Sequence, residues 1–414
     1  STGLGKTRMQ LTAAHHVAQH TGRPALVLAP LAVAAQTVTE GESIGIGATL
    51  CREDSDVRDG INVTNYDRLH RFDVDRFSMA VLDESSILKV FSSATRNTII
   101  DRFKATPYKL ACSATPAPND FTELGNHAEF LGVMSRPEML SQWFIHDGGS
   151  TQDWRLKGHA AKSFWRWVCS WGALVRSPAD LGYDASLYDL PELVMREHVV
   201  SADILTARTM GKLFVDAART LDEQRKARRA SLSARVAKMA DIVNAEPGEL
   251  WVLWCELNDE ADSLESMIPG AVQIAGSDSA DVKEARLSDF AAGRIRVLVT
   301  KPSICGHGLN WQRCARTGFV GVSHSFEQTF QAIRRFWRYG QTRPVHVHMV
   351  IGEAEGAVLA NLRRKEQDAT RMAEEMSLYT REFVRSEVKS AGRTFDEYNP
   401  KATMKRPTWL RSAA

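Results

Sequence analysis

Residues 1–7 read Ser-Thr-Gly-Leu-Gly-Lys-Thr, and a helix-forming segment (8–20) and a short apolar strand (25–29) follow them. Where a helix begins, Gly3 and Gly5 let backbone N–H groups close around phosphate oxygens. Lys6 would reach the outer phosphates of a nucleoside triphosphate, and the Thr7 hydroxyl would hold Mg²⁺. A Gly-Lys-Thr triplet alone is also typical of a surface turn, so the interpretation as a phosphate-binding loop depends on the rest of the chain.

Strands and helices alternate along the chain, which predicts an α/β fold. Short apolar strands are expected at 25–29, 62–64, 79–82 and 109–113, and again at 250–255, 271–274, 296–300, 317–322 and 345–350. Strands separated by helices form parallel sheets, and functional residues collect at the carboxyl ends of such strands. At 414 residues the chain is long enough for two or three domains.

The middle of the chain has a different character. Residues 119–190 contain a crowd of tryptophans at helical spacing: Trp143, Trp154, Trp165, Trp167 and Trp171. The pattern favours a helical subdomain that buries its own aromatic rings, and a platform for stacking nucleic-acid bases is the alternative. Further helices are expected at 199–221, 222–245 and 356–389, followed by a polar tail at 390–414.

The composition limits the classes of protein to consider. Charged residues at 25% and hydrophobic residues at 43% are typical of a soluble globular protein. No apolar run is long enough to cross a bilayer, so no membrane partner is expected. Six scattered cysteines fit a reducing cytosol better than a zinc site or a disulfide framework. Basic residues cluster at 225–229 and 334–343; a bound polyanion and a solvated helix face explain the first cluster equally well.

Polar side chains follow two of the expected strands. Asp83 and Glu84 end the strand at 79–82 and would meet Lys6 at one edge of the sheet. Asp83 would hold Mg²⁺, directly or through water, and Glu84 would orient or deprotonate an attacking water. Adjacent carboxylates are usually a solvated turn, but their place after a strand favours the functional interpretation. Ser113 and Thr115 follow the next strand, where hydroxyls can couple a nucleotide to a domain interface.

Residues 331–341 read Gln-Ala-Ile-Arg-Arg-Phe-Trp-Arg-Tyr-Gly-Gln. Arg335 and Arg338 are three residues apart and, on a predicted helix, would share a face. Two guanidinium groups on one face favour an anion, and a γ-phosphate held by the first domain would make them arginine fingers. A surface ion-pair helix is the alternative, but it does not explain Gln331 or the Gly340-Gln341 pair.

Together these motifs resemble those of superfamily 2 helicases, most closely the Swi/Snf-like translocases, from residue 1 to about residue 362. They occur in the order of that family: Gly3-Leu-Gly-Lys-Thr7, Leu26-Val-Leu-Ala-Pro30, Val81-Leu-Asp-Glu84, Ser113-Ala-Thr-Pro116, Gly306-His-Gly-Leu-Asn310 and Gln331 to Gln341. Two features depart from the family pattern: Ser85-Ser86 replaces Ala-His or a similar pair, and Arg334 replaces a common acidic residue. The short spans between motifs are similar to those of compact phage and bacterial members.

The resemblance implies two tandem RecA-like parallel-sheet lobes with ATP and Mg²⁺ in the cleft between them and nucleic acid across both. The first lobe would be residues 1–196, incomplete at its N-terminus, with a helical insertion at about 119–190, and the second would be 197–389 with C-terminal helices. The implied roles are catalysis by Glu84, Arg335 and Arg338; binding of ATP and Mg²⁺ by Gly3, Gly5, Lys6, Thr7 and Asp83; coupling by Ser113, Thr115 and Gln331; and contact with nucleic acid by Lys301, Gly306, Gly308 and Asn310.

The activity expected from the resemblance is that of an ATP-dependent DNA translocase or helicase. It would act as a monomer on duplex or single-stranded DNA in the cytoplasm of a bacterium or phage-infected cell. An RNA helicase and an ATP-gated nucleic-acid clamp without translocation are the alternatives. In this family a strand inside the first sheet feeds the phosphate-binding loop, and an adenine-recognition segment precedes it. We therefore expect both upstream of Ser1, and expect a protein that begins at Ser1 to fold its first lobe poorly.

Overall fold

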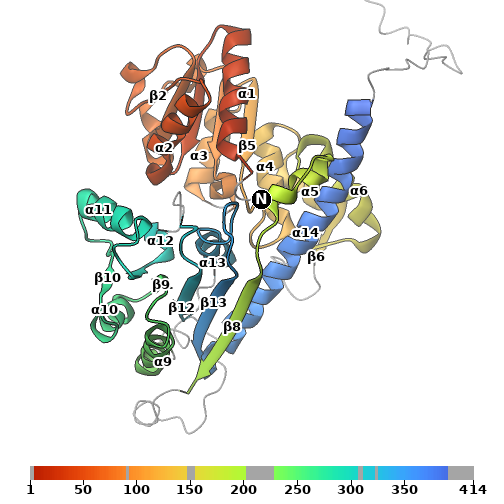
Figure 1. Cartoon of the computed structure of the whole chain (residues 1–414). Coiled ribbons are helices and arrows are strands. Elements are labelled where there is room, and N and C mark those ends of the chain that lie inside the picture. Colours follow the sequence, from red (N-terminus) through yellow and green to blue (C-terminus); the bar gives the residue numbers. More distant parts are fainter. Residues whose placement is uncertain are drawn as a thin grey trace, which may run out of the picture.

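The computed structural model describes residues 4–89, 93–146, 154–201, 228–305, 311–321 and 325–389. The strand–helix order correctly predicts an α/β protein with parallel sheets. Figure 1 shows two sheet-containing units, with a helical insertion beside the first and one long C-terminal helix running alongside. Within the described residues, no helix is both long enough and apolar enough to cross a membrane.

The first sheet is parallel throughout and has the strand order β2-β3-β1-β4-β5. Its strands are β1 (Ala25–Ala29), β2 (Ala48–Leu50), β3 (Ile61–Asn65), β4 (Met79–Asp83) and β5 (Tyr108–Cys112). Helices α1 (Lys6–Thr21) and α2 (Leu31–Ser43) share a core with one face of the sheet, and α3 (Ala94–Arg102) shares a core with the other. Because both faces are covered, the central strands β1, β3 and β4 are buried at every position rather than at alternate ones.

The second sheet is also parallel, with the order β10-β11-β9-β12-β13-β8. Its strands are β8 (Leu193–Val200), β9 (Trp251–Trp254), β10 (Ala271–Gln273), β11 (Val297–Thr300), β12 (Arg316–Val320) and β13 (Val345–Gly352). Helices α9 (Leu232–Asn244) and α10 (Asn258–Met267) pack on one face. Residues of α11 (Ala280–Ala291), α12 (Pro302–Cys305), α13 (Phe326–Ile333) and α14 (Gly356–Lys389) join the core on the other.

The helical insertion buries its aromatic rings, as its composition predicts. It comprises α4 (Leu124–Leu131), α5 (Arg136–Trp143), a small hairpin of β6 (Phe144–His146) and β7 (Trp154–Leu156), and α6 (Ala161–Trp171). Trp165 is fully buried and Trp143 stacks on Trp167. Met372 and Met376 of α14 complete this core, so the C-terminal helix joins the insertion to the second sheet.

Strand β8 differs from the sequence-based expectation. Residues 199–200 were expected to begin a helix and residue 197 to begin the second unit, but β8 spans Leu193–Val200 and pairs along its length with β13. The second sheet therefore starts at Leu193. β8 is an edge strand with Arg196 and Glu197 exposed, so it lacks the continuous apolar run that marks the other strands. The rest of the expected helix at 202–221 lies outside the described residues.

Candidate active site

Lys6 and Glu84 come together at the carboxyl edge of the first sheet. Helix α1 begins at Lys6, immediately after Gly5, whose φ of 78° lies in the left-handed region that favours glycine. The Lys6 Nζ atom lies 3.3 Å from Glu84 Oε1. Thr7 is half-buried one position further along α1, and Gly3 lies outside the described residues. The structure thus joins the loop lysine to the strand-end carboxylate, as their positions in the sequence predict.

Asp83 lies beside this pair and is only 5% exposed. Gln10, on the next turn of α1, donates a hydrogen bond from Nε2 to Asp83 Oδ1 at 2.8 Å, and the Tyr66 hydroxyl donates to the Asp83 carbonyl oxygen at 2.6 Å. Burial, followed by the negative charge of Glu84, raises the pKa of Asp83. A bound cation would oppose both effects by favouring the ionised carboxylate.

One carboxylate oxygen of this site lacks a hydrogen-bond donor among the described residues. Glu84 Oε2 is buried and has no hydrogen-bond partner among the residues that the structure describes. A buried carboxylate oxygen without a donor is costly, and Mg²⁺ or its bound water would satisfy it. The groups that would hold the ion, the carboxylates of Asp83 and Glu84 and the Thr7 hydroxyl, all offer oxygen, which is the ligand atom that Mg²⁺ prefers. Their chemistry therefore fits a magnesium ion.

The backbone of Glu84 is strained. Its φ of 51° is positive, and within the described residues no other non-glycine residue has a positive φ. Such a conformation persists where the surroundings enforce it, and it is common at functional sites. Here the short helix η4 (Ser85–Leu88) follows directly, and helix α4 holds it: Asn126 Nδ2 donates to the carbonyl oxygens of Leu88 and Lys89 at 2.8 and 3.1 Å.

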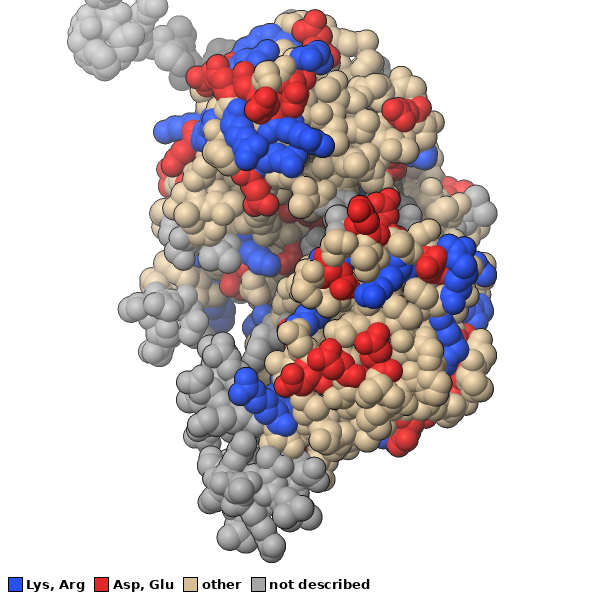
Figure 2. Space-filling model, turned by 90° about the vertical axis from the view of Figure 1, so that its left-hand side faces the viewer, with Lys and Arg blue, Asp and Glu red and all other residues tan. Residues whose placement is uncertain are grey.

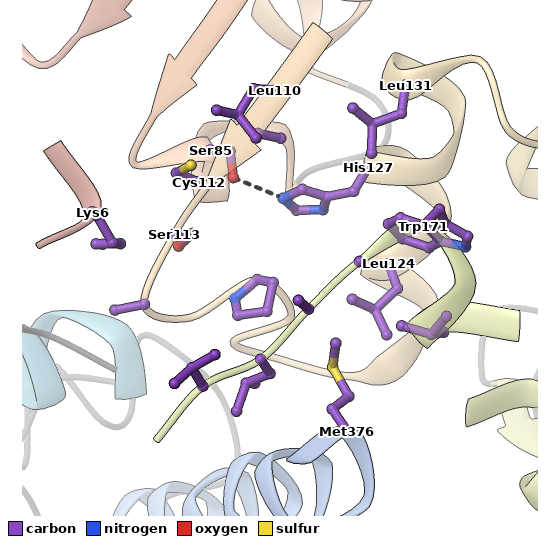
Figure 3. Close-up of a pocket in the computed structure, with 18 of the residues that line it drawn as sticks. Lys6, Ser85, Leu110, Cys112, Ser113, Leu124, His127, Leu131, Trp171 and Met376 are labelled. Carbon is purple, nitrogen blue, oxygen red and sulfur yellow. Dashed lines mark hydrogen bonds between the residues drawn. The ribbon is translucent and has the colours of Figure 1, made fainter. Parts of the chain in front are cut away.

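His127, also on α4, makes a third contact with this turn. Its Nε2 atom lies 3.1 Å from the Ser85 hydroxyl, and its Nδ1 atom lies 3.4 Å from the Glu123 carbonyl oxygen. Figure 3 shows the ring directed at Ser85, with Lys6 on the opposite side of the groove. Burial lowers the pKa of His127 to about 4, so the ring is neutral at pH 7. Because a carbonyl can only accept, we assign the proton to Nδ1, and Ser85 then donates to Nε2.

Arg335 and Arg338 reach the first unit, but not from one helix face as predicted. Helix α13 ends at Ile333, and both arginines lie in the turns that follow. Phe336 is fully buried against Trp311 and Trp254, which draws the chain into the core and ends the helical path. The surface ion-pair helix, the alternative at this position, is therefore not what forms.

Electrostatics indicate which carboxylates the two arginines face. Burial lowers the pKa of Arg335 to about 10, and the charge of Glu84 acts in the opposite direction. Burial also lowers the pKa of Arg338, which Glu40 of α2 opposes. Both arginines of the second unit thus sense acidic residues of the first unit. Of the two arginines, Arg335 is the one whose pKa responds to the charge of Glu84.

The three predicted coupling residues gather around Glu327 of α13. The Ser113 hydroxyl accepts a hydrogen bond from the Thr115 N–H at 3.0 Å. The Thr115 hydroxyl and the Gln331 amide each donate to Glu327 Oε1 at 3.4 Å, and Lys89 pairs with Glu327 Oε2. A cavity of about 410 Å³ is lined by Glu84 and Lys89 of the first unit and by Glu327 and Gln331 of the second. The structure therefore brings the strand end of the first unit against α13 of the second.

The predicted nucleic-acid residues are only partly described. Lys301 is half-buried directly after β11, whereas Gly306, Gly308 and Asn310 lie outside the described residues. Of the basic cluster at 225–229, Arg228 pairs with the buried Glu260, which indicates a structural role for that residue. Figure 2 shows acidic and basic side chains interspersed on one face, with a recess between the upper and lower parts.

A groove of about 370 Å³ runs along the free edge of β5 (Figure 3). Its floor is the strand itself, from Lys109 to Cys112. Leu4 and Met9 line it from the α1 side, and residues of α4, of the segment after α6, and of α14 line the other side. The groove is therefore largely apolar and follows the direction of a strand.

Three contributors to the site escaped prediction from the sequence. Gln10 was detectable, because it lies four residues after Lys6 and so on the same face of α1. Glu327 has the same relation to Gln331, one turn along α13. His127 gave no such signal, because it contacts Ser85 only through the packing of α4 against the turn, 42 positions away in the sequence.

No protein-family model matches the chain. The chain is similar to protein p41 of Acyrthosiphon pisum secondary endosymbiont phage 1, with 23% identity over 418 aligned positions that cover 85% of this chain and 88% of p41. The similarity covers most of both proteins, and the name of p41 does not state an activity.

Proposed function

We propose that the protein is a DNA-stimulated ATPase of the superfamily 2 type, in which two RecA-like lobes use ATP hydrolysis to move along DNA. One observation carries the proposal: the first sheet places Lys6 at 3.3 Å from Glu84 beside the buried Asp83. The charge of Glu84 also raises the pKa of Arg335 in the second unit, against the effect of burial. A lysine, two carboxylates and an arginine from opposite sides of a cleft form the set that phosphoryl transfer requires.

Each residue has a role that follows from its chemistry. Lys6 would grip the outer phosphates, releasing Glu84 from their present ion pair. Thr7 and Asp83 would hold Mg²⁺, which neutralises charge on the phosphates when bound. Glu84, freed of Lys6, would orient the attacking water and accept its proton. Arg335 would stabilise the charge that develops on the transferred phosphoryl group, with Arg338 beside it.

Movement along DNA would follow from the contacts between the two units. Thr115, at a strand end of the first sheet, meets Glu327 and Gln331 on the helix that leads to Arg335. A change in the nucleotide site would therefore alter how the second unit sits on the first, and the whole cycle would shift their grip on the nucleic acid. The RNA helicase and the non-translocating clamp remain the competing assignments, and the resemblance to Swi/Snf-like proteins favours DNA.

Two substitutions distinguish phosphate binding by Lys6 from activation of the attacking water by Glu84. They should be made in a protein that carries the upstream strand expected before the phosphate-binding loop. Lys6→Ala should abolish binding of a fluorescent ATP analogue, whereas Glu84→Gln should bind it and fail to turn over. The exposed Lys104→Ala and Glu42→Gln serve as matched controls and should behave as wild type. Normal turnover by Glu84→Gln would remove Glu84 from the catalytic role.

A further inference from the structure

We propose that Glu327 and Lys89 form a positioning pair that sets Arg335 against the catalytic turn of the first unit. The inference rests on the proposed function and adds to it two residues that lie outside the motifs from which that function was expected. Neither residue touches the Lys6–Glu84 pair, so both would act through other groups.

Glu327 lies at a junction of both units. It is 7% exposed, and its two carboxylate oxygens divide their contacts between the units. Oε2 pairs with Lys89, and Oε1 accepts from Thr115 of the first unit and from Gln331 of its own helix, both at 3.4 Å. A buried carboxylate is stabilised only by such partners, so its placement depends on all three.

Both ends of the pair are tied to catalytic groups. Lys89 directly follows η4, five positions after Glu84. Asn126 holds the backbone of Lys89 by donating a hydrogen bond to its carbonyl oxygen at 3.1 Å. On the other side, Glu327 lies on α13, and the chain reaches Arg335 two residues after that helix ends. The Lys89–Glu327 ion pair therefore connects the turn that contains Glu84 to the segment that carries Arg335.

A general surface ion pair would not have these properties. Exposed pairs such as Arg343–Glu249 contribute little, because water competes with the contact. The side chain of Glu327 is 8% exposed and that of Lys89 is 33% exposed, so the pair is shielded on the glutamate side. Loss of one partner would leave Glu327 with too few donors and allow α13 to shift. A shift of about 1 Å at a catalytic group can cost on the order of a hundredfold in rate.

The test is a charge exchange measured as ATP turnover at saturating DNA, with the affinity for a fluorescent ATP analogue and the thermal unfolding midpoint recorded in parallel. Glu327→Gln and Lys89→Met should each lower kcat by about tenfold or more. Analogue affinity should stay within about threefold of wild type, because the phosphate grip of Lys6 is intact. The double exchange Glu327→Lys with Lys89→Glu should be more active than either Glu327→Lys or Lys89→Glu alone.

The control is Arg294→Met, which breaks an exposed pair within the second unit and should leave kcat unchanged. Wild-type kcat in both Glu327→Gln and Lys89→Met would overturn the inference, as would an exchange variant no better than its single variants. Should Glu327→Gln fail to fold, Lys89→Met still decides, because Lys89 is partly exposed. If wild-type protein hydrolyses no ATP under any condition, the proposed function fails, and that outcome is distinct from failure of the positioning pair alone.

Discussion

At the scale of single residues, Glu84 interacts electrostatically with basic residues of both units. Lys6 reaches it from α1, and its negative charge raises the pKa of Arg335 in the second unit, against the effect of burial. Its backbone is strained, and the residues that follow are clamped by Asn126 and His127. A strained, well-supported carboxylate with one unsatisfied oxygen is arranged for a ligand rather than for stability.

Arg335→Ala should lower ATP turnover by about a thousandfold and leave ATP-analogue affinity largely intact, because a finger acts mainly on the transition state. Arg335→Lys should not rescue turnover, since an ammonium group lacks the planar fork of a guanidinium. Arg294→Ala, which removes an exposed arginine of the second unit, is the control in the same steady-state assay. A tenth or more of wild-type turnover in Arg335→Ala would contradict the assignment.

His127 should make the protein less stable in acid. Its pKa is about 4 in the folded protein against 6.5 ordinarily, so between these values the unfolded chain binds more protons. Stability from this group is therefore present above pH 6.5 and is lost as pH falls toward 4. The buried Glu123 carboxyl, whose pKa is raised to about 7, acts in the opposite direction, because its contribution is lost as pH rises.

Comparison of wild type with His127→Gln isolates the histidine from these opposing groups. We expect the free energy of unfolding in urea to fall more for wild type than for His127→Gln between pH 7.5 and pH 5. Equal losses in the two proteins would show that His127 does not stay neutral inside the fold.

The sequence predicted the residues whose position follows from one strand. Asp83 and Glu84 end β4, and Ser113 and Thr115 follow β5, so the parallel sheet alone brings them to one edge. Residues that depend on packing between elements were not predictable in this way. His127 and Lys89 acquire their partners only through the seating of α4 and α13, which no local periodicity encodes.

At the scale of elements, the apolar strands were easy to place from the sequence, including the edge strands β5 and β10, and two edge strands were not. The central strands β1, β3 and β4 are completely buried, and each was expected within a residue or two. β2 and β8 were missed, because β2 is only three residues long and β8 carries charged residues in its middle. The helix expected through Arg338 ended early because Phe336 is held in the core.

Strand β5 leads to a prediction about the first sheet. Among the described residues it is paired on one side only, and it is half-buried or exposed at every position, unlike its neighbour β4. The apolar groove along its free edge passes Leu4, just before α1. We predict that the strand feeding the phosphate-binding loop pairs with β5 in this groove.

The prediction is tested by adding about 30 upstream residues, enough for a strand and a further recognition segment. The longer protein should show a higher thermal unfolding midpoint and DNA-stimulated ATP hydrolysis, because an added strand satisfies the exposed ladder of β5. Equal melting temperatures and equal hydrolysis for the two lengths would show that no strand is needed there.

At the scale of the whole molecule, two parallel sheets are joined by more than the linker between them. Lys89 and Thr115 contact Glu327, Lys365 of α14 donates to Asn119 at 2.8 Å, and α14 completes the core of the helical insertion. These contacts hold the two units together at the cleft, and α14 connects them a second time. The sequence did not predict that α14 connects the two units. Its first apolar residues pack in the core of the second sheet and its later ones in the core of the helical insertion, and the sequence does not show which core each residue joins.

The proposed function requires that DNA stimulates ATP hydrolysis in this cleft. The direct measurement is steady-state ATP turnover by the extended protein in four conditions: without nucleic acid, with duplex DNA, with single-stranded DNA and with RNA. We expect low basal turnover, strong stimulation by at least one form of DNA, little stimulation by RNA, and loss of all turnover in Glu84→Gln. No hydrolysis in any condition, or stimulation by RNA alone, would contradict it.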